Sequence, residues 1–134
     1  MIKIDGKAFS QTVLEKIREE HSQLKEKYGK LAGLAVVIVG NNPASQVYVK
    51  NKIRACENVG FYSENIELDE NISEKELLQE IDKLNKNDRI NGILVQLPLP
   101  AHINELKIID SISPEKDVDG FHGLSLQMVG MFLF

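Results

Sequence analysis

The strongest constraint on the fold is a short apolar run, LAVVIVG at residues 34–40, which is rich in β-branched side chains and ends in glycine. Such a run is typical of a strand that is buried on both faces of a sheet. A second apolar run, INGILVQLPLP at 90–100, ends in two prolines that must stop a strand. A weaker strand pattern, FYSENIELD, covers 61–69. The sequence therefore predicts a sheet with strongly buried strands.

Helical patterns lie before, between and after these runs. The predicted helices cover residues 8–29, 44–60, 74–87 and 103–112. The first has an apolar stripe, and the third opens with a capping box formed by Ser73 and Glu76. The residues expected on these apolar faces are Phe9, Val13, Ile17, Leu24 and Tyr28 in the first helix, and Leu77, Leu78, Ile81 and Leu84 in the third. Strands that alternate with helices predict an α/β fold, a three-layer sandwich with a mostly parallel sheet flanked by helices.

Composition narrows the function. The 134 residues have the size of one domain, and a formal net charge of −4 argues against nucleic-acid binding. The single cysteine, Cys56, excludes an internal disulfide and is expected in the core, and no Cys/His cluster indicates a metal site. The sequence shows no secretion signal and no apolar run near the roughly 20 residues that span a membrane. We therefore predict a cytoplasmic protein without membrane partners. His21 and His102 are expected on its surface.

Tyr48 and Lys52 lie four residues apart on the second predicted helix, directly after the turn VGNNP. With Ser45 they form a strip along one edge of its apolar face. A lysine there can bury its stem and place its amine in a cleft, and partial desolvation lowers the pKa of such an amine toward neutrality. The alternative is a lysine whose stem covers the rim of the core and whose amine stays in water.

Three further positions stand out near the ends of the predicted strand and loop. Gln96 follows the apolar GILV, where a buried amide needs partners, and it could hydrogen-bond Lys52 or cap a loop. Pro98 and Pro100 could form a rigid wall beside a flat ligand or simply end the strand, and either bond can be cis. Asp119 could accept two hydrogen bonds from an amino-heterocycle or belong to an Asp-Gly turn.

Three segments together, VGNNPASQVYVKNKIRACENVGF, GILVQLPLP and SPEKDVDGFH, resemble the bifunctional methylenetetrahydrofolate dehydrogenase/methenyltetrahydrofolate cyclohydrolase family. The resemblance extends from the first residues to about His122. It implies an amino-terminal catalytic domain of the amino-acid-dehydrogenase-like type over residues 1–122, which binds tetrahydrofolate derivatives. Residues 123–134 would begin the connection to an NAD(P)-binding domain, and full-length members would be homodimers.

The resemblance also implies a reaction and roles. A hydride leaves 5,10-methylenetetrahydrofolate for NADP, and water then opens the methenyl product to 10-formyltetrahydrofolate. By position, Lys52 matches the catalytic lysine, Tyr48 the tyrosine that stacks on the folate, Gln96 the glutamine that orients the lysine, and Asp119 the aspartate that grips the pterin. The implied catalytic residues are Lys52, Tyr48 and Gln96, and the implied substrate-binding residues are Tyr48, Val49, Lys52, Val95, Gln96, Leu97, Pro98 and Asp119.

The sequence departs from the family pattern after His122, where it reads GLSLQMVGMFLF, and it contains no GxGxxG-like segment for a dinucleotide. We therefore expect very weak dehydrogenase turnover, reduced cyclohydrolase activity and weak folate binding. The choice between NADP and NAD stays open. Alternatives are a non-enzymatic folate-binding module, a flavodoxin-like or receiver domain, and the amino-terminal domain of another dehydrogenase. The strong strands do not end in the acidic cluster that a receiver needs.

Overall fold

The computed structural model describes residues 5–125. Its elements, in chain order, are α1 (Gly6–Tyr28), β1 (Gly33–Val39), α2 (Pro43–Val59), β2 (Tyr62–Leu68), α3 (Glu74–Asn85), β3 (Gly92–Val95), α4 (Glu105–Ser111) and a short 3₁₀ turn at Pro114–Lys116. Each predicted helix and strand is present, with bounds that differ by a few residues. The largest difference is the strand predicted over 90–100, which ends at Val95, before the prolines. The tail predicted to begin a connection lies outside the described residues from 126 onward.

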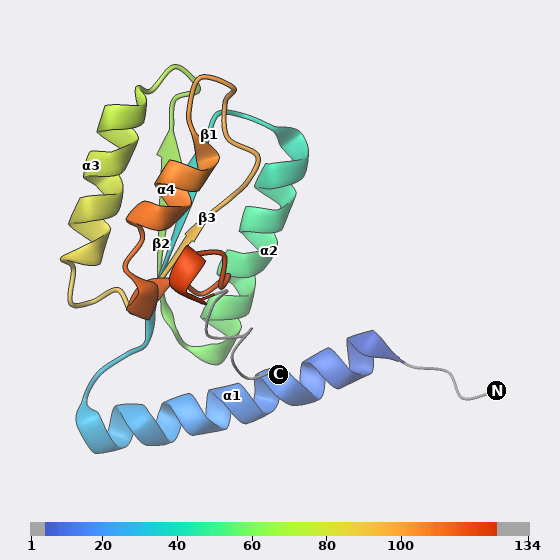
Figure 1. Cartoon of the computed structure of the whole chain (residues 1–134). Coiled ribbons are helices and arrows are strands. Elements are labelled where there is room, and N and C mark those ends of the chain that lie inside the picture. Colours follow the sequence, from blue (N-terminus) through green and yellow to red (C-terminus); the bar gives the residue numbers. More distant parts are fainter. Residues whose placement is uncertain (1–4, 126–134) are drawn as a thin grey trace, which may run out of the picture.

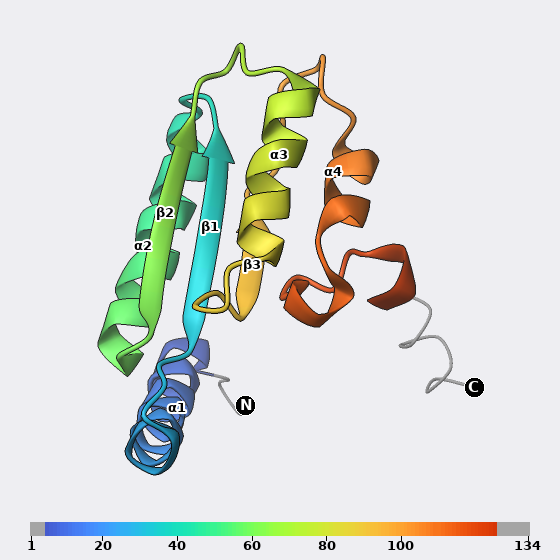
Figure 2. The ribbon, with the colours of Figure 1, turned by 90° about the vertical axis from the view of Figure 1, so that its left-hand side faces the viewer.

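The three described strands form one parallel sheet in the order β2-β1-β3. In its register, Leu34 of β1 lies opposite Ser63 of β2 and Gly92 of β3. Helix α2 covers one face of the sheet, while α3 and α4 cover the other, as Figures 1 and 2 show from two sides. The predicted α/β fold, with helices on both faces of a parallel sheet, is confirmed.

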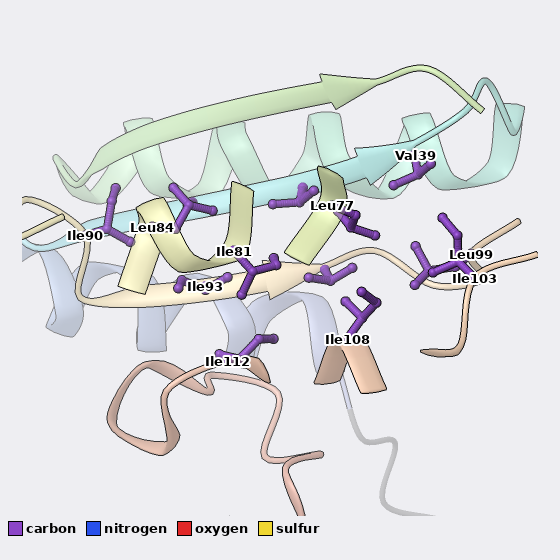
Figure 3. Packing of buried hydrophobic residues seen from close by; sticks show 13 residues of the cluster. Val39, Leu77, Ile81, Leu84, Ile90, Ile93, Leu99, Ile103, Ile108 and Ile112 are labelled. Carbon is purple, nitrogen blue, oxygen red and sulfur yellow. The ribbon is translucent and has the colours of Figure 1, made fainter. Parts of the chain in front are cut away.

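Side chains of β1 pack into two separate hydrophobic clusters, because successive residues of a strand point to opposite faces of the sheet. Val36 and Ile38 pack with Val49 of α2 and Leu94 of β3. The opposite face of the sheet packs against α3 and α4, with Ile81 at its centre (Figure 3). That larger cluster comprises Ala35, Val37, Val39, Leu77, Ile81, Leu84, Ile90, Ile93, Val95, Leu99, Ile103, Ile108 and Ile112. Burial on both faces explains why β1 is a continuous apolar run.

Helix α1 differs from the rest of the fold because most of its apolar stripe faces solvent. Phe9 is 71% exposed and Tyr28 is 60% exposed, and Val13 and Leu24 are also exposed. The helix lies across the amino ends of the strands, and α2 is its main packing partner (Figure 1). Helical periodicity shows which residues share a face, but it does not show whether another element covers that face.

The prediction that His21 lies on the surface is wrong. This residue of α1 is only 6% exposed. Its Nε2 accepts a hydrogen bond from the backbone N–H of Ala32 at 3.2 Å, and its ring meets Phe61 edge-on with 4.9 Å between centroids. The histidine is thus the point at which α1 attaches to the segment that leads into β1. His102, in contrast, is exposed as predicted.

The described residues hold a single thiol, no cluster of side chains for a metal ion and no helix that could cross a membrane. Cys56 is buried, as predicted, and burial, followed by the neighbouring Glu57, raises the pKa of its thiol. This part of the chain holds no group of three or more His, Cys, Asp or Glu side chains that could bind a metal ion. None of its helices combines the length and the apolar character needed to cross a membrane.

We predict that Gly33→Ala destabilises the protein by about 1–3 kcal/mol, the usual range for overpacking. Gly33 begins β1 and exchanges hydrogen bonds with Asn91: its N–H donates to Asn91 Oδ1 at 2.9 Å, and its carbonyl accepts from Asn91 N at 2.7 Å. A Cβ at Gly33 would overlap the carbonyl oxygen of Arg89. Urea unfolding midpoints measure the effect. Gly6→Ala is the control, because a Cβ there meets nothing within 4 Å, and equal midpoints for both variants would contradict the prediction.

Candidate functional site

The candidate site begins with the turn after β1. Gly40 takes a positive φ of 79°, and its N–H donates to Leu68 O at 2.8 Å, which lets the chain turn sharply at the carboxyl end of the strand. The side-chain oxygen of Asn42 then accepts from the N–H groups of Ala44 and Ser45 and caps α2. The sequence GNNPAS thus directs α2 back along the sheet, with its first turns at the strand ends.

Lys52, on α2, meets Gln96 at the end of β3. Its Nζ donates to Gln96 Oε1 at 3.2 Å, and the lysine is partly buried. Gln96 is itself held twice: its backbone N–H donates to Val37 O at 2.8 Å, and its side-chain Nε2 donates to Leu97 O at 2.8 Å. The glutamine side chain therefore has a fixed direction, and its oxygen fixes the direction of the amine. Directly after it, the Leu97–Pro98 peptide bond is cis, and Pro98 is exposed.

Asp119 lies in a loop that runs beside β3. Ile93 of β3 forms an isolated parallel bridge with Asp117, so the loop continues the sheet locally like a short extra strand. Two residues later, Asp119 shares a small hollow with Val95 and Leu97, the two neighbours of Gln96. Asp119 is exposed, and no other group within residues 5–125 forms a hydrogen bond or an ion pair with its carboxylate. The carboxylate is therefore available to a ligand.

The remaining predicted residues divide between surface and core. Tyr48, one turn before Lys52 on α2, is 61% exposed, so its ring face is open to a ligand. Val49 is 3% exposed and Val95 is also buried, so both side chains belong to the cores. Among the described residues, no hydrogen bond joins Asp119 to Lys52 or Tyr48, and their roles stay predictions. Of the predicted residues, the structure thus brings Lys52 and Gln96 into direct contact and leaves Tyr48 and Asp119 exposed.

Sequence reasoning missed Asp117. Its carboxylate accepts hydrogen bonds from the N–H groups of Gly120 and His122 and from the hydroxyl of Ser125. The spacing of an aspartate three residues before a glycine is a common turn signal and could have revealed it.

A separate hollow lies at the opposite end of the sheet. It has a volume of about 730 Å³ and lies between the end of α1, the start of β2 and the turn before β3, where Arg89 stacks over the Tyr62 ring at 4.2 Å. None of the predicted site residues lines it. A second hollow of about 330 Å³ lies at the carboxyl ends of the strands and includes Pro98. Because open parallel sheets bind ligands at the carboxyl ends, we place the candidate site there.

Comparison with known proteins shows which family this chain is similar to. Residues 4–119 match the family described as tetrahydrofolate dehydrogenase/cyclohydrolase, catalytic domain. The bifunctional protein FolD of Bacillus cereus (strain B4264) is 58% identical over 123 residues, which cover 92% of this chain and 43% of that protein. The FolD protein of Streptococcus thermophilus is 52% identical over 122 residues, with 91% and 43% covered. The chain thus spans less than half the length of these relatives.

Solved structures show the same fold. The bifunctional FolD enzyme of Campylobacter jejuni superposes with a TM-score of 0.92 at 49% identity, covering 95% of this chain and 45% of that one. The Trypanosoma brucei dehydrogenase-cyclohydrolase, solved with NADP cofactor and an inhibitor, gives 0.86 at 36% identity, with 89% and 40% covered. Because the family match covers most of its residues, the chain belongs to the family of tetrahydrofolate dehydrogenase/cyclohydrolase catalytic domains.

Proposed function

We propose that this chain provides the folate site and the catalytic lysine of a methylenetetrahydrofolate dehydrogenase/methenyltetrahydrofolate cyclohydrolase. Residues 1–122 form the folate-binding catalytic domain, and residues 123–134 begin the connection to an NAD(P)-binding domain. The observation that carries the proposal is the hydrogen bond from Lys52 Nζ to Gln96 Oε1 at 3.2 Å, because it gives the amine a fixed direction at the carboxyl end of the sheet. Family membership supports the identity of the substrate.

In the cyclohydrolase step, water adds to the positively charged methenyl carbon of the folate. One of the two protons of this water goes to the folate nitrogen whose bond to that carbon breaks, and the other is released as the formyl group forms. Lys52, as a neutral amine, takes the first proton from the water and delivers it to the nitrogen. Gln96 keeps the amine pointed at the reacting carbon.

Tyr48 and Asp119 position the folate. The exposed ring of Tyr48 stacks on the flat substrate, and Asp119 accepts hydrogen bonds from the amino group and ring N–H of the pterin. The hollow beside Asp119 is only about 10 Å³, far below the roughly 300–1,000 Å³ of ordinary ligand pockets, so the pterin lies across its mouth. Fixing the folate in this way holds the methenyl carbon near the amine.

NADP, when bound, supplies the hydride acceptor for the dehydrogenase step. The described residues do not fit a dinucleotide. The turn between β1 and α2 contains one glycine, and Asn42 already occupies the first amide groups of α2, where a pyrophosphate would need to bind. We therefore assign none of the described residues to NADP and expect very weak dehydrogenase turnover from them alone.

A titration with a reduced folate tests the binding part of the proposal. We expect 5-formyltetrahydrofolate to bind the chain, and Asp119→Ala to weaken that binding about 10- to 100-fold, the effect of losing charge-assisted hydrogen bonds worth about 1.5–3 kcal/mol. Isothermal titration calorimetry gives both dissociation constants. Glu115→Ala is the control, because Glu115 is an exposed acid in the same segment. Equal affinity of the Asp119 variant and the control would contradict the role of Asp119.

A non-enzymatic folate-binding module is the second candidate, because Asp119 is exposed and accepts no hydrogen bond from residues 5–125, which suits binding whether or not hydrolysis follows. This alternative predicts binding without hydrolysis. Following methenyltetrahydrofolate absorbance in parallel with the titration separates the two. Hydrolysis at the buffer rate together with measurable binding would favour the module.

A further inference from the structure

The segment from residue 117 to 125 is folded around one carboxylate, that of Asp117. Its Oδ1 accepts from Gly120 N at 3.2 Å, and its Oδ2 accepts from His122 N at 3.0 Å and from Ser125 Oγ at 2.8 Å. Gly120 takes a positive φ of 68°, which allows the chain to reverse there. Asp119 lies inside this turn, between the acceptor and the first donor. Its backbone position is therefore set by the hydrogen bonds of Asp117.

The same turn is attached to the body of the fold on two sides. Lys116 Nζ donates to three carbonyl oxygens at the end of α3, those of Leu84, Asn85 and Asn87, at 3.1, 2.7 and 3.0 Å. On the other side, Asp117 bridges Ile93 of β3. Since Gln96 lies three residues after Ile93 and Asp119 lies two residues after Asp117, the parallel register brings Asp119 alongside the end of β3.

A close contact between Val118 and Gly92 limits movement of the turn along β3. Val118 packs against Gly92, and a Cβ at that glycine would overlap Val118 Cγ1. A glycine at the start of β3 thus lets the turn approach the strand closely. Together, the bridge and this contact fix the distance between the turn and the strand that carries Gln96.

We propose that Asp117 is a positioning residue that holds the carboxylate of Asp119 toward the pterin of the folate. This inference rests on the proposed function, because the proposed function identifies the folate pterin as the ligand of Asp119. Asp117 accepts three hydrogen bonds from its own turn, whereas Asp119 accepts no hydrogen bond from any residue between 5 and 125. The two aspartates therefore have different roles: Asp117 shapes the turn, and Asp119 contacts the ligand.

The protonation state of Asp117 suits this role. Burial alone would raise the pKa of the Asp117 carboxyl, but the N–H groups of His122, Phe121 and Gly120 and the hydroxyl of Ser125 together hold the pKa below its usual value. The group is therefore an ionised acceptor at neutral pH. Asp117→Asn keeps its size but replaces one acceptor oxygen with an NH₂ group. In either orientation of the amide, this group faces a backbone N–H, that of Gly120 or that of His122, and cannot accept from it.

A double-mutant cycle tests the inference with Asp117→Asn, Asp119→Asn and the double variant, each titrated with 5-formyltetrahydrofolate. We expect Asp117→Asn to weaken binding about tenfold in the wild-type background and less than about twofold in the Asp119→Asn background, because coupled sites are not additive. A residue that only supports the fold would weaken binding equally in both backgrounds. Thermal unfolding midpoints of all four proteins, measured in parallel, show whether each variant is folded at the titration temperature.

Ser125→Ala provides a second, milder variant, since it removes one donor to Asp117 and leaves both carboxylates in place. We expect a smaller loss of affinity, of about two- to fivefold, which again disappears in the Asp119→Asn background. Equal losses in both backgrounds for Asp117→Asn and Ser125→Ala would overturn the inference and leave the proposed function intact. A wild-type chain that binds no 5-formyltetrahydrofolate would overturn both.

Discussion

Replacing Lys52 with methionine is expected to reduce the hydrolysis of 5,10-methenyltetrahydrofolate by this chain about 10²- to 10⁴-fold, the usual contribution of a positioned proton-transfer group, down to the buffer rate. Methionine keeps the length and packing of the stem beside the core but cannot carry a proton. The hydrogen bond to Gln96 Oε1 disappears with the amine. The decay of methenyl absorbance over time, corrected for the rate in buffer alone, measures the effect.

Lys50→Met is the matched control for this experiment. Lys50 lies on the same helix two residues earlier, is exposed, and forms no ion pair among the described residues. Its variant should hydrolyse the substrate like the wild type. If Lys52→Met and the wild type are equally fast and both exceed the buffer rate, Lys52 is not the proton-transfer group. If all three proteins match the buffer, the chain has no hydrolytic activity.

Ile81→Ala is expected to lower the free energy of unfolding by about 2–5 kcal/mol, the range for removing a large aliphatic side chain from a core. Ile81 lies on α3, has no exposed surface, and packs in the middle of the larger cluster between α3, α4 and the sheet (Figure 3). Since small domains are stable by about 5–15 kcal/mol, the loss is a large share of the total. Urea denaturation followed by circular dichroism measures it.

Gln79→Ala, on the exposed face of the same helix, isolates the packing effect from helix propensity. Surface substitutions of this kind change stability by less than about 0.5 kcal/mol. A loss at Ile81 no larger than the loss at Gln79 would mean that the larger cluster does not hold α3 against the sheet.

The sheet and the helices that cover it could be predicted because each relevant signal was local. The β-branched run of β1 and the capping box of Ser73 and Glu76 act over a few residues, and the capping box is present in the structure as predicted. The exposure of Phe9 and the burial of His21 could not be predicted, because both depend on where α1 lies relative to α2 and the strand ends.

The candidate site was predictable in a different way. Gln96 attracted attention as an amide in an apolar strand, and its hydrogen bond with Lys52 follows from the register of β1 and β3, which bring α2 and the end of β3 together. Asp117 was not singled out, because two aspartates in one short loop look alike in the sequence. Only the donors around each carboxylate distinguish Asp117, which accepts hydrogen bonds from its own turn, from Asp119, which accepts none from residues 5–125.

The placement of α1 has a consequence for how the molecule opens. Within residues 5–125, two hydrogen bonds join this helix to the rest of the fold: Arg18 Nε donates to Asn58 O at 2.6 Å, and Ala32 N donates to His21 Nε2 at 3.2 Å. In the turns before Arg18, most side chains are exposed, and only Leu14 and Ile17 are partly buried. The amide protons of these turns should therefore exchange with deuterium rapidly, through local fraying. The amide protons of α3 should exchange more slowly, because their exchange requires complete unfolding.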